Sequence, residues 1–516
     1  MKTPRGASRQ PYSARNDGRE MSREPAEIEV DWMRELAVHY EQLRRAYPTD
    51  DLCIVFDIDG TILDMRHLVV NALLSYDREH QTELFQGLRP DDISVHESRI
   101  DRFLSGRAIT DAVKQDVLDW YAERFWSSEA ILTGSRPFSG VLSVIRWFQL
   151  QPATSVALNT GRPEELRELT LRSLNEVARH HRVSFESALL WMNPRGWEHV
   201  LESKVEGLDE LRSRGHRIVS VVDNEPANIR AMSEADAGGE VLFLHADTLF
   251  DTQRETTPRT VSGKSYGLTG LVSEEDLRTR VEFVWHGVND EANLRQFLAS
   301  GIHWSECDIR KDPVGRIVLR HDSFEETPWT RAEHPFLLEA CLSRLRTANR
   351  AVVLDIKEGG DVPQRVLEQV GALEFDDADL CFLGSIETLG EHGMRLISQT
   401  RPETTLSFMA DFVGPLLLAV PTLAAQVLDT LRQWGVSRVA IDWRTTPHIH
   451  DILERFEEYG WEVNIHGVPD LEGFLEAALL LPRALTADFN FPDWHYYGRG
   501  SGQQSVYHRY NLIAGA

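Results

Sequence analysis

Two carboxylates stand two residues apart directly after the first strongly apolar segment of the chain. Asp57 and Asp59 follow the apolar residues 52–56 and precede Gly60 and Thr61. A buried parallel strand ends at the sheet edge where ligands bind, so we expect both carboxylates at such an edge. Like charges held together repel, and a cation or a catalytic task would offset that cost. Asp and Gly are also common in turns, so this motif alone leaves a structural role open.

Three further polar segments supply the other groups that phosphoryl transfer needs. Apolar, strand-like residues 154–158 and 218–222 are each followed by polar residues, and a lysine precedes the second segment. The polar residues are, in chain order, Asn159, Thr160, Gly161 and Arg162, then Lys204, then Asp223. Together with Asp57 and Asp59 they offer a carboxylate nucleophile, a second carboxylate, a hydroxyl, a lysine and an acid for a divalent cation. Such a set suits transfer through an aspartyl-phosphate.

In this order the four motifs, over residues 48–250, resemble those of the haloacid dehalogenase-like phosphohydrolases. The resemblance implies that Asp57 is the nucleophile and that Asp59 is the general acid/base. The implied phosphate-binding residues are Thr160, Gly161 and Lys204, and the implied Mg²⁺ ligands are Asp57, the backbone carbonyl of Asp59, and Asp223. Oxygen ligands of this kind are those that a hard cation prefers.

The same half departs from the family pattern in its fourth motif and carries a long insertion. Asn224 stands where many family members have a second acid. Residues 65–134, between Asp57 and Thr160, exceed what a strand–helix connection needs. Their apolar residues have helical spacing. We therefore expect a helical cap over the site, which would exclude water and select the substrate.

A second set of chemically active residues begins in the second half of the chain, at or near the ends of strand-like segments. Members of each acid pair or acid–lysine pair are two residues apart, so their side chains would point the same way on a strand. The set is His286, Glu306 with Asp308, His321, and Asp355 with Lys357. Three carboxylates could hold Mg²⁺ or Ca²⁺, two histidines could act as acid and base on a phosphodiester, and a lysine could neutralise a phosphate oxygen. Each piece alone is more often structural; all four together favour a site.

The elements that must position these residues alternate short strands with amphipathic helices. The second half has nine strand-like segments: residues 281–285, 303–309, 316–319, 351–356, 380–383, 405–409, 439–442, 462–465 and 485–488. This number matches a closed (β/α)8 barrel, whose active site lies at the carboxyl ends of its strands. The predicted fold class is α/β: a Rossmann-like domain with a helical cap over residues 29–250, a linker over 251–279, and a TIM barrel over 280–516.

Residues 281–492 resemble the glycerophosphodiester phosphodiesterase and sphingomyelinase D superfamily of phospholipase C-like barrels. The sequences His286-Gly-Val-Asn289 and Asp355-Ile-Lys357 lean toward the sphingomyelinase D-like branch. The resemblance implies an acid/base pair of histidines, three carboxylate metal ligands and a phosphate-contacting lysine. These are His286 and His321, then Glu306, Asp308 and Asp355, then Lys357. In that branch a substrate hydroxyl can attack the phosphorus and give a cyclic phosphate.

Composition limits the class of protein. The 516 residues exceed one domain, and the net charge of −26 argues against a nucleic-acid partner. No apolar run approaches the roughly 18–20 residues of a membrane span. Four widely spaced cysteines and an N-terminus without an apolar leader predict a cytoplasmic protein, and residues 1–28 read as a disordered tail. The 55 basic residues include only six lysines, so Lys204 and Lys357 are conspicuous.

These features predict a bifunctional phosphoester hydrolase that acts on small phosphorylated substrates. The first domain would be a Mg²⁺-dependent phosphomonoesterase, and the barrel a phosphodiesterase dependent on Mg²⁺ or Ca²⁺. Two alternatives stay open at this level. Only one domain is catalytic and the other is a binding or scaffold module, or the barrel forms a phosphodiester in a specialised metabolite. The sequence leaves the oligomeric state open.

Overall fold

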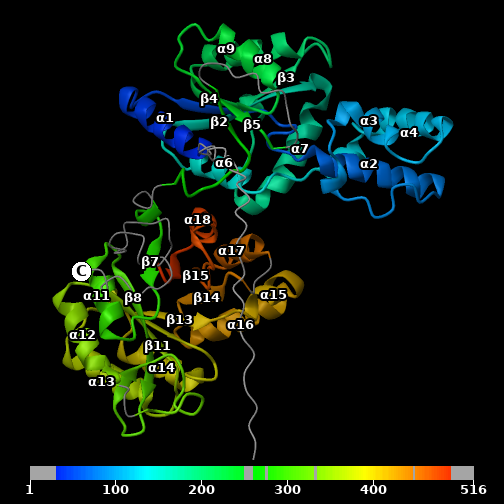
Figure 1. Cartoon of the computed structure of the whole chain (residues 1–516). Coiled ribbons are helices and arrows are strands. Elements are labelled where there is room, and N and C mark those ends of the chain that lie inside the picture. The colour runs from blue at the N-terminus through cyan, green and yellow to red at the C-terminus, as the bar shows by residue number, and fades with distance from the viewer. Residues whose placement is uncertain (1–30, 249–259, 273–276, 331–333, 445–447, 490–516) are drawn as a thin grey trace, which may run out of the picture.

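The computed structural model describes residues 31–248, 260–272, 277–330, 334–444 and 448–489, which form two bodies with separate sheets (Figure 1). The predicted tail of residues 1–28 lies outside the described residues. We call the first body the sheet domain. Its six strands are all parallel, in the order β3-β2-β1-β4-β5-β6. They are β1 (Leu52–Phe56), β2 (Thr154–Pro163), β3 (Leu190–Asn193), β4 (Arg217–Asp223), β5 (Leu242–Ala246) and β6 (Thr260–Gly263).

Helices cover both faces of this sheet. They are α1 (Trp32–Ala46), α6 (Val141–Gln149), α7 (Arg167–Ala178), α8 (Val200–Ser213) and α9 (Pro226–Ala235). The β1 side chains alternate between the faces: Cys53 and Val55 pack in the core beneath α8 and α9, whereas Ile54 and Phe56 join the core with α1 and α6. Burial on both faces explains why β1 is apolar at every position.

Four helices follow β1, and those of them that Figure 1 labels project from the side of the sheet domain. They are α2 (Met65–His80), α3 (Ile100–Ser105), α4 (Asp111–Arg124) and α5 (Ser128–Gly134). Polar side chains cap three of their N-termini: Asp64 accepts from Arg66 N–H, Thr110 from Val113 N–H, and Ser127 from Ala130 N–H. They occupy the residues predicted as a cap.

Part of the predicted linker differs from the expectation. Residues 260–263 form β6, which pairs in parallel with β5 and extends the sheet. Just beyond it, Trp32 Nε1 donates a hydrogen bond to the carbonyl oxygen of Ser265 over 2.6 Å. A four-residue strand with one large apolar residue, Val261, has too little periodicity to be recognised in sequence.

The second body is a closed parallel barrel. Its eight strands are β7 (Glu282–Trp285), β8 (Trp304–Lys311), β11 (Ala351–Ile356), β12 (Leu380–Gly384), β13 (Thr405–Met409), β14 (Arg438–Asp442), β15 (Glu462–His466) and β16 (Ala484–Ala487). The ring closes because β7 pairs with both β16 and β8. The predicted α/β fold class, a Rossmann-like sheet followed by a (β/α)8 barrel, is confirmed.

One expected barrel strand has a different place. Residues 317–319 form β9 (Ile317–Leu319), which runs antiparallel to the outer part of β8 and pairs with the short β10 (Phe336–Leu337). The hairpin turns at Gly315, whose φ of +90° favours glycine. Because β9 runs back along β8, the residues after it return toward the end of the barrel where β8 carries Asp308.

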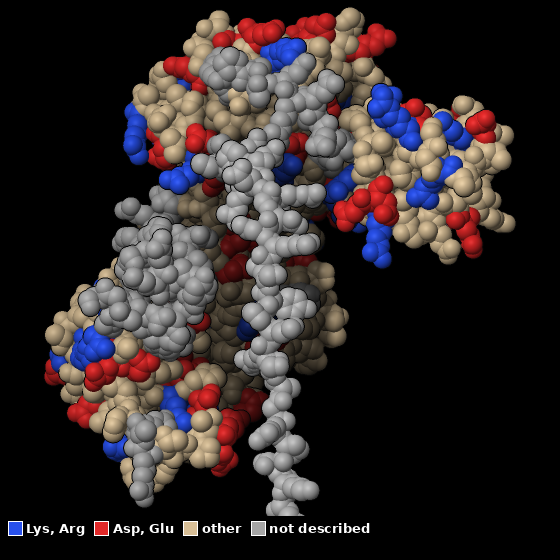
Figure 2. All heavy atoms as spheres, in the orientation of Figure 1, with Lys and Arg blue, Asp and Glu red and all other residues tan. Residues whose placement is uncertain are grey.

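Helices surround the barrel. They are α11 (Glu291–Ala299), α12 (Leu338–Thr347), α13 (Val362–Ala372), α14 (Gly390–Thr400), α15 (Val413–Ala419), α16 (Pro421–Gln433), α17 (Ile449–Glu458) and α18 (Leu471–Leu479). Among the described residues, no helix is both long and apolar enough to cross a membrane. On the face shown in Figure 2, acidic and basic side chains are interspersed.

The two bodies touch through helices. The short helix η4 (Arg179–His181) and the residue after it lie against α17, where Arg182 pairs with Glu457 at 2.9 Å and His180 Nδ1 lies 3.0 Å from Asp451 Oδ1. Arg146 on α6 donates to the Leu479 carbonyl oxygen at the end of α18 over 3.3 Å. Beside these polar contacts, one cluster of buried apolar residues has members in both bodies.

Candidate active sites

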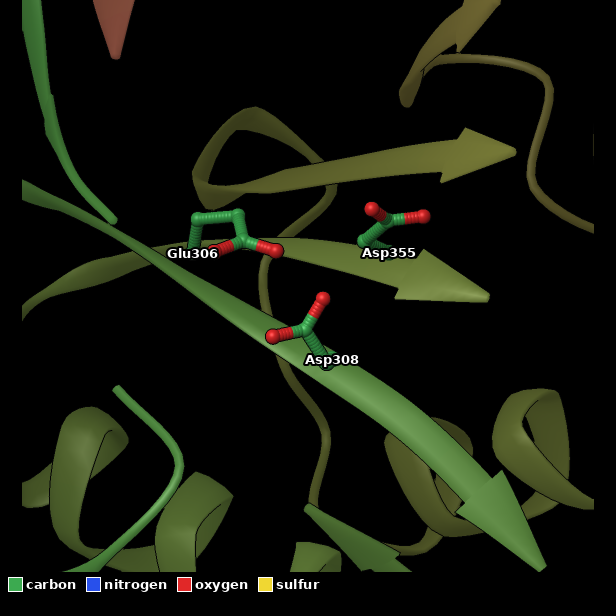
Figure 3. A group of neighbouring side chains, drawn as sticks. All are labelled: Glu306, Asp308 and Asp355. Carbon is green, nitrogen blue, oxygen red and sulfur yellow. The ribbon is translucent and has the colours of Figure 1, made fainter. Parts of the chain in front are cut away.

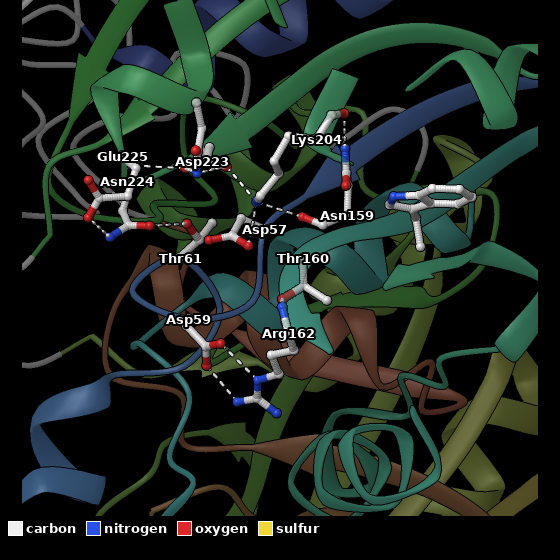
Figure 4. A network of polar contacts seen from close by, with 12 residues as sticks. Asp57, Asp59, Thr61, Asn159, Thr160, Arg162, Lys204, Asp223, Asn224 and Glu225 are labelled. Carbon is white, nitrogen blue, oxygen red and sulfur yellow. Dashed lines mark hydrogen bonds and ion pairs between the residues drawn. The ribbon is translucent and has the colours of Figure 1, made fainter. Parts of the chain in front are cut away.

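A buried lysine joins two carboxylates at the carboxyl edge of the sheet domain (Figure 4). Asp57 follows β1 and Asp223 ends β4, so the parallel pairing of these strands brings the two acids side by side. Lys204 Nζ, from α8, donates to Asp57 Oδ1, Asp223 Oδ2 and the Asn159 carbonyl oxygen, each over 2.7 Å. Burial lowers the pKa of Lys204, but the two carboxylates outweigh it and raise the pKa, so the ammonium stays charged.

Asp59 is held by an arginine. Arg162 donates from Nε to Asp59 Oδ2 over 2.8 Å and from Nη2 to Oδ1 over 2.5 Å. The arginine is buried, and its guanidinium also lies over the ring of Trp126. This two-pronged contact fixes the Asp59 carboxylate. Thr160 and Gly161, on the same β2 segment, line the adjoining cavity, and Thr160 Oγ1 accepts the Arg162 N–H.

The residues at the predicted cation site of this domain differ in the groups that they contact. Asp223 directs one oxygen at Lys204 and accepts at the other from the Glu225 N–H and the Asn228 amide. Asn224, the next residue, instead reaches the Asp59 carbonyl oxygen and Asp57 Oδ2. Two oxygens and an amide group that face one another are a donor set that fits a hard cation. Asp223 as a ligand stays a prediction.

The cap and the sheet domain enclose one cavity of about 490 Å³ beside these residues. Asp57, Asp59 and Lys204 line its sheet side, and Tyr121 and Trp126 line its cap side. The cap touches the core across the cavity. His96 lies 3.4 Å from Glu225, and the rings of Trp126 and Trp197 are 4.7 Å apart.

Three carboxylates converge at the barrel mouth (Figure 3). Glu306 and Asp308 point inward from β8, and Asp355 points inward from the neighbouring β11. One oxygen from each lies within 4.8 Å of the others, and all three side chains are buried. Burial raises the pKa of Glu306 to about 8, and Asp308 and Asp355 add to the rise. Buried like charges at this spacing fit a hard divalent cation.

A lysine and an asparagine hold this group in place. Lys357 Nζ lies 3.0 Å from Asp308 Oδ1 and 2.5 Å from Asp355 Oδ2. Asn289 Nδ2 donates to Asp308 Oδ2 over 2.5 Å, and the Asp308 N–H donates back to Asn289 Oδ1 over 2.9 Å. Burial raises the pKa of Asp308, but Lys357 and Asn289 outweigh it and hold the pKa below its usual value. Asp308 is therefore ionised.

The two predicted histidines both line a cavity of about 370 Å³ at this mouth, together with Glu306, Asp355 and Lys357. His286 Nδ1 lies 2.7 Å from Asp488 Oδ1, and its Nε2 lies 3.9 Å from Glu306. Burial lowers the pKa of His286, but the hydrogen bond to Asp488 and the nearby carboxylates raise it to about 9. His321 follows β9 and is largely exposed, with Nδ1 at 2.9 Å from Asp322.

The structure thus brings each predicted set together, and it adds residues that sequence reasoning missed. Asp488, after the last barrel strand, orients His286, and Arg162 holds Asp59. Asp488 stands at the end of a strand, the same signal that identified the other acids. For Arg162 the signal was its position directly after Asn159, Thr160 and Gly161, in the polar segment that follows residues 154–158. The cap aromatics had no signal, because only the folded cap aims them at the cavity.

No protein-family model matches the chain, and no curated protein matches it. Three solved structures illustrate what its fold is similar to. A glycerophosphodiester phosphodiesterase from Parabacteroides distasonis is 14% identical, with 40% of this chain and 93% of that chain covered at a TM-score of 0.31. A haloacid dehalogenase-like hydrolase from Streptococcus pneumoniae is 13% identical (41% and 94%, TM-score 0.28), and CbbY from Rhodobacter sphaeroides, in complex with phosphate, is 16% identical (42% and 98%, TM-score 0.28). TM-scores this low carry no argument about function, so the function is inferred from the geometry of the two sites.

Proposed function

We propose that the protein hydrolyses phosphoric esters at two separate sites. The sheet domain is a Mg²⁺-dependent phosphomonoesterase, and the barrel is a phosphodiesterase dependent on Mg²⁺ or Ca²⁺. One shared observation carries the proposal: in each site a lysine at the wall of a cavity bridges carboxylates that lie on, or directly after, two neighbouring strands. A lysine and a cation held by carboxylates supply positive charge, which suits the doubly charged phosphate of a monoester or the singly charged phosphate of a diester.

In the sheet domain, Asp57 is the nucleophile. One of its carboxylate oxygens attacks the phosphorus, the ester P–O bond breaks, and the Asp59 carboxyl donates a proton to the leaving alcohol. Asp59 then takes a proton from water, whose oxygen attacks the phosphorus and releases Asp57 with inorganic phosphate. Arg162 stabilises the carboxylate form of Asp59 that the second step requires. Mg²⁺ held by Asp57 and the Asp59 carbonyl would neutralise phosphate charge.

In the barrel, His286 and His321 are the acid/base pair, and Asp488 fixes the tautomer and orientation of His286. One histidine takes the proton of the attacking hydroxyl, and the other protonates the leaving oxygen as the diester P–O bond breaks. The attacking hydroxyl belongs either to water or to the substrate, which would give a cyclic phosphate. Lys357 contacts the phosphate, and Glu306, Asp308 and Asp355 would hold the cation that neutralises it.

Two aryl esters test this proposal on the full-length protein. We expect Asp57→Asn to lower the hydrolysis of p-nitrophenyl phosphate about 10²-fold or more while bis-p-nitrophenyl phosphate turnover is unchanged. We expect His286→Ala to do the reverse, with a loss of about 10²–10⁴-fold, because each change removes the chemistry of one site. Steady-state rates with added Mg²⁺ or Ca²⁺ give the readout, and phosphorus NMR distinguishes a cyclic from an open product.

Matched controls change the same residue types outside both sites. Asp51→Asn changes a carboxylate at the opposite end of β1, and His303→Ala changes an exposed histidine before β8. Both should keep both activities. Wild-type protein that turns over neither ester, or a single substitution that abolishes both activities in a folded protein, would contradict two independent sites.

A further inference from the structure

A row of tyrosine, phenylalanine and tryptophan rings lines the cavity of about 490 Å³ in the sheet domain. Tyr121 and Phe125 lie one helical turn apart at the end of α4, and their stacked rings have centroids 4.7 Å apart. The ring of Trp126 lies edge-on to Phe125 at 5.1 Å and 4.7 Å from the ring of Trp197, which belongs to the turn between β3 and α8. We call these four side chains the aromatic row. A cavity of this volume has room for the leaving group of an ester as well as its phosphate.

Trp197, the last member of the aromatic row, is 51% exposed although it lines the cavity. Trp120 on α4 provides the contrast. Its ring lies 6.1 Å from Tyr76 and 5.1 Å from His80 within the cap, and it does not line the cavity. A large apolar ring that stays exposed at the wall of a pocket marks a contact surface for a ligand.

The polar side chains of the cap that line the same cavity already contact one another. His96 Nδ1 lies 2.8 Å from Ser98 Oγ, and His96 Nε2 lies 3.3 Å from Glu97 and 3.4 Å from Glu225. The Tyr121 hydroxyl donates to the Glu97 carbonyl oxygen over 3.2 Å. A leaving group with several hydroxyls would have to compete for these partners. A planar ring needs only the surface of the aromatic row.

Arg162 limits the charge that the leaving group can carry. Its guanidinium lies over the ring of Trp126, 5.2 Å from the centroid, while it also holds Asp59. The guanidinium therefore takes a ring face that an ammonium group would otherwise use, and its charge repels a second cation. The cavity wall thus suits an uncharged ring better than an organic cation.

We propose that the phosphomonoester hydrolysed in the sheet domain has an aromatic leaving group, whose uncharged ring packs against Trp197 and the other rings of the aromatic row. This inference rests on the proposed function, because it assumes that the phosphate of the substrate lies at Asp57. It goes beyond that function by naming the class of alcohol that is released. A planar ring is preferred to a saturated ring of similar size, because contacts between aromatic rings add to the burial of apolar surface.

Three alkyl phosphates whose leaving alcohols have similar acidity test the inference on the full-length protein. They are phenethyl phosphate, cyclohexylethyl phosphate and ethyl phosphate, so differences in kcat/KM report on the ring rather than on the leaving-group chemistry. A cyclohexyl ring is at least as apolar as a phenyl ring, so burial alone would not favour the phenyl ester. We expect kcat/KM for phenethyl phosphate to exceed that for cyclohexylethyl phosphate about fivefold or more. It should exceed that for ethyl phosphate roughly 10–100-fold.

Variants of Trp197 locate the preference. Trp197→Leu should lower the ratio of kcat/KM for phenethyl phosphate to kcat/KM for cyclohexylethyl phosphate about threefold or more, and Trp197→Phe, which keeps a ring, should retain most of that ratio. Trp120→Leu is the matched control, because it removes a tryptophan of α4 that lies outside the cavity, and its ratio should equal that of the wild type. An equal or larger kcat/KM for cyclohexylethyl phosphate, faster hydrolysis of choline phosphate than of phenethyl phosphate, or the same ratio in Trp197→Leu as in the wild type would each overturn the inference.

Phosphonates separate the inference from the proposed function, because they bind without turnover. In isothermal titration with MgCl₂ present, we expect phenylpropylphosphonate to bind about fivefold or more tightly than cyclohexylpropylphosphonate, and Trp197→Leu to lose this preference. The preference without any monoester hydrolysis would leave the aromatic subsite intact and overturn the phosphatase. Hydrolysis of all three esters at equal kcat/KM would overturn the aromatic leaving group and leave the phosphatase intact. Neither hydrolysis nor phosphonate binding would overturn both.

Discussion

At the scale of single residues, lysine and arginine side chains have different tasks in the proposed sites. Lys204 and Lys357 each place one compact ammonium between carboxylates from two different strands or strand ends. Arg162 instead covers both oxygens of one carboxylate, Asp59. A point charge on a flexible stem suits the first task, and a planar fork suits the second. In a chain with six lysines, two of them serve the proposed sites.

This difference predicts the effect of a conservative change at Arg162. Arg162→Lys keeps the charge but loses the fork, so Asp59 becomes free to rotate. We expect the kcat for p-nitrophenyl phosphate to fall about 10–100-fold, with diester turnover unchanged. Arg167→Lys is the control, since Arg167 makes the same two-pronged contact with the partly exposed Glu164. Equal kcat values for the two variants would contradict a positioning role for Arg162.

At the scale of elements, the sequence predicted strands that carry enough apolar residues. All eight barrel strands and the central strands of the sheet domain were recognisable from such runs. The strand β3 was not, because its apolar run begins in the short helix η5 (Ser187–Leu189) and only Leu190–Asn193 is extended. Residues 316–319 were recognised as a strand, but the sequence could not reveal their antiparallel pairing with β8, which depends on the turn at Gly315.

The same limit applies to the sites. Strand ends predicted which acids would gather, because parallel strands end at one edge. The different tasks of Asp223 and Asn224 could not be predicted, since they depend on the directions of two adjacent side chains at one strand end. Likewise, the contact between Asp488 and His286 needed the closure of β16 against β7.

An ion-pair cluster at the amino end of the barrel makes a prediction about its closure. Arg438, the first residue of β14, is buried and pairs with Glu282 at the start of β7 and Glu462 at the start of β15. Arg438→Met would leave both carboxylates short of a partner, so we expect a loss of about 2–4 kcal/mol in the free energy of unfolding. Urea denaturation measures this loss. Diester turnover should be unchanged, because the active site lies at the other end.

Arg483 provides the matched comparison for that variant. It contacts the same two glutamates, but its side chain is 51% exposed. Arg483→Met should therefore cost less than about 1 kcal/mol. If both arginine variants lose the same stability, burial of Arg438 is not the reason for its contribution.

At the scale of the whole molecule, histidines gather where the two bodies meet. His180 and His181 on η4 face His450 on α17, and the rings of His181 and His450 are 5.2 Å apart. Burial lowers the pKa of His450, and together with His181, His180 and Arg182 it brings the pKa to about 4, although Asp451 acts in the opposite direction. The folded protein therefore holds His450 neutral at a pH where a free histidine begins to gain a proton.

The contact between the bodies should weaken in acid. Between about pH 6.5 and 4 the unfolded chain binds a proton at His450 that the folded chain does not, so stability falls as the pH falls through this window. From pH 7 to pH 5 we expect wild type to lose about 2 kcal/mol more than His450→Gln, or roughly 4–8 °C in the thermal midpoint. His392→Gln, on the exposed face of α14, should follow wild type. Parallel pH curves for wild type and His450→Gln would show that this histidine does not couple the two bodies to pH.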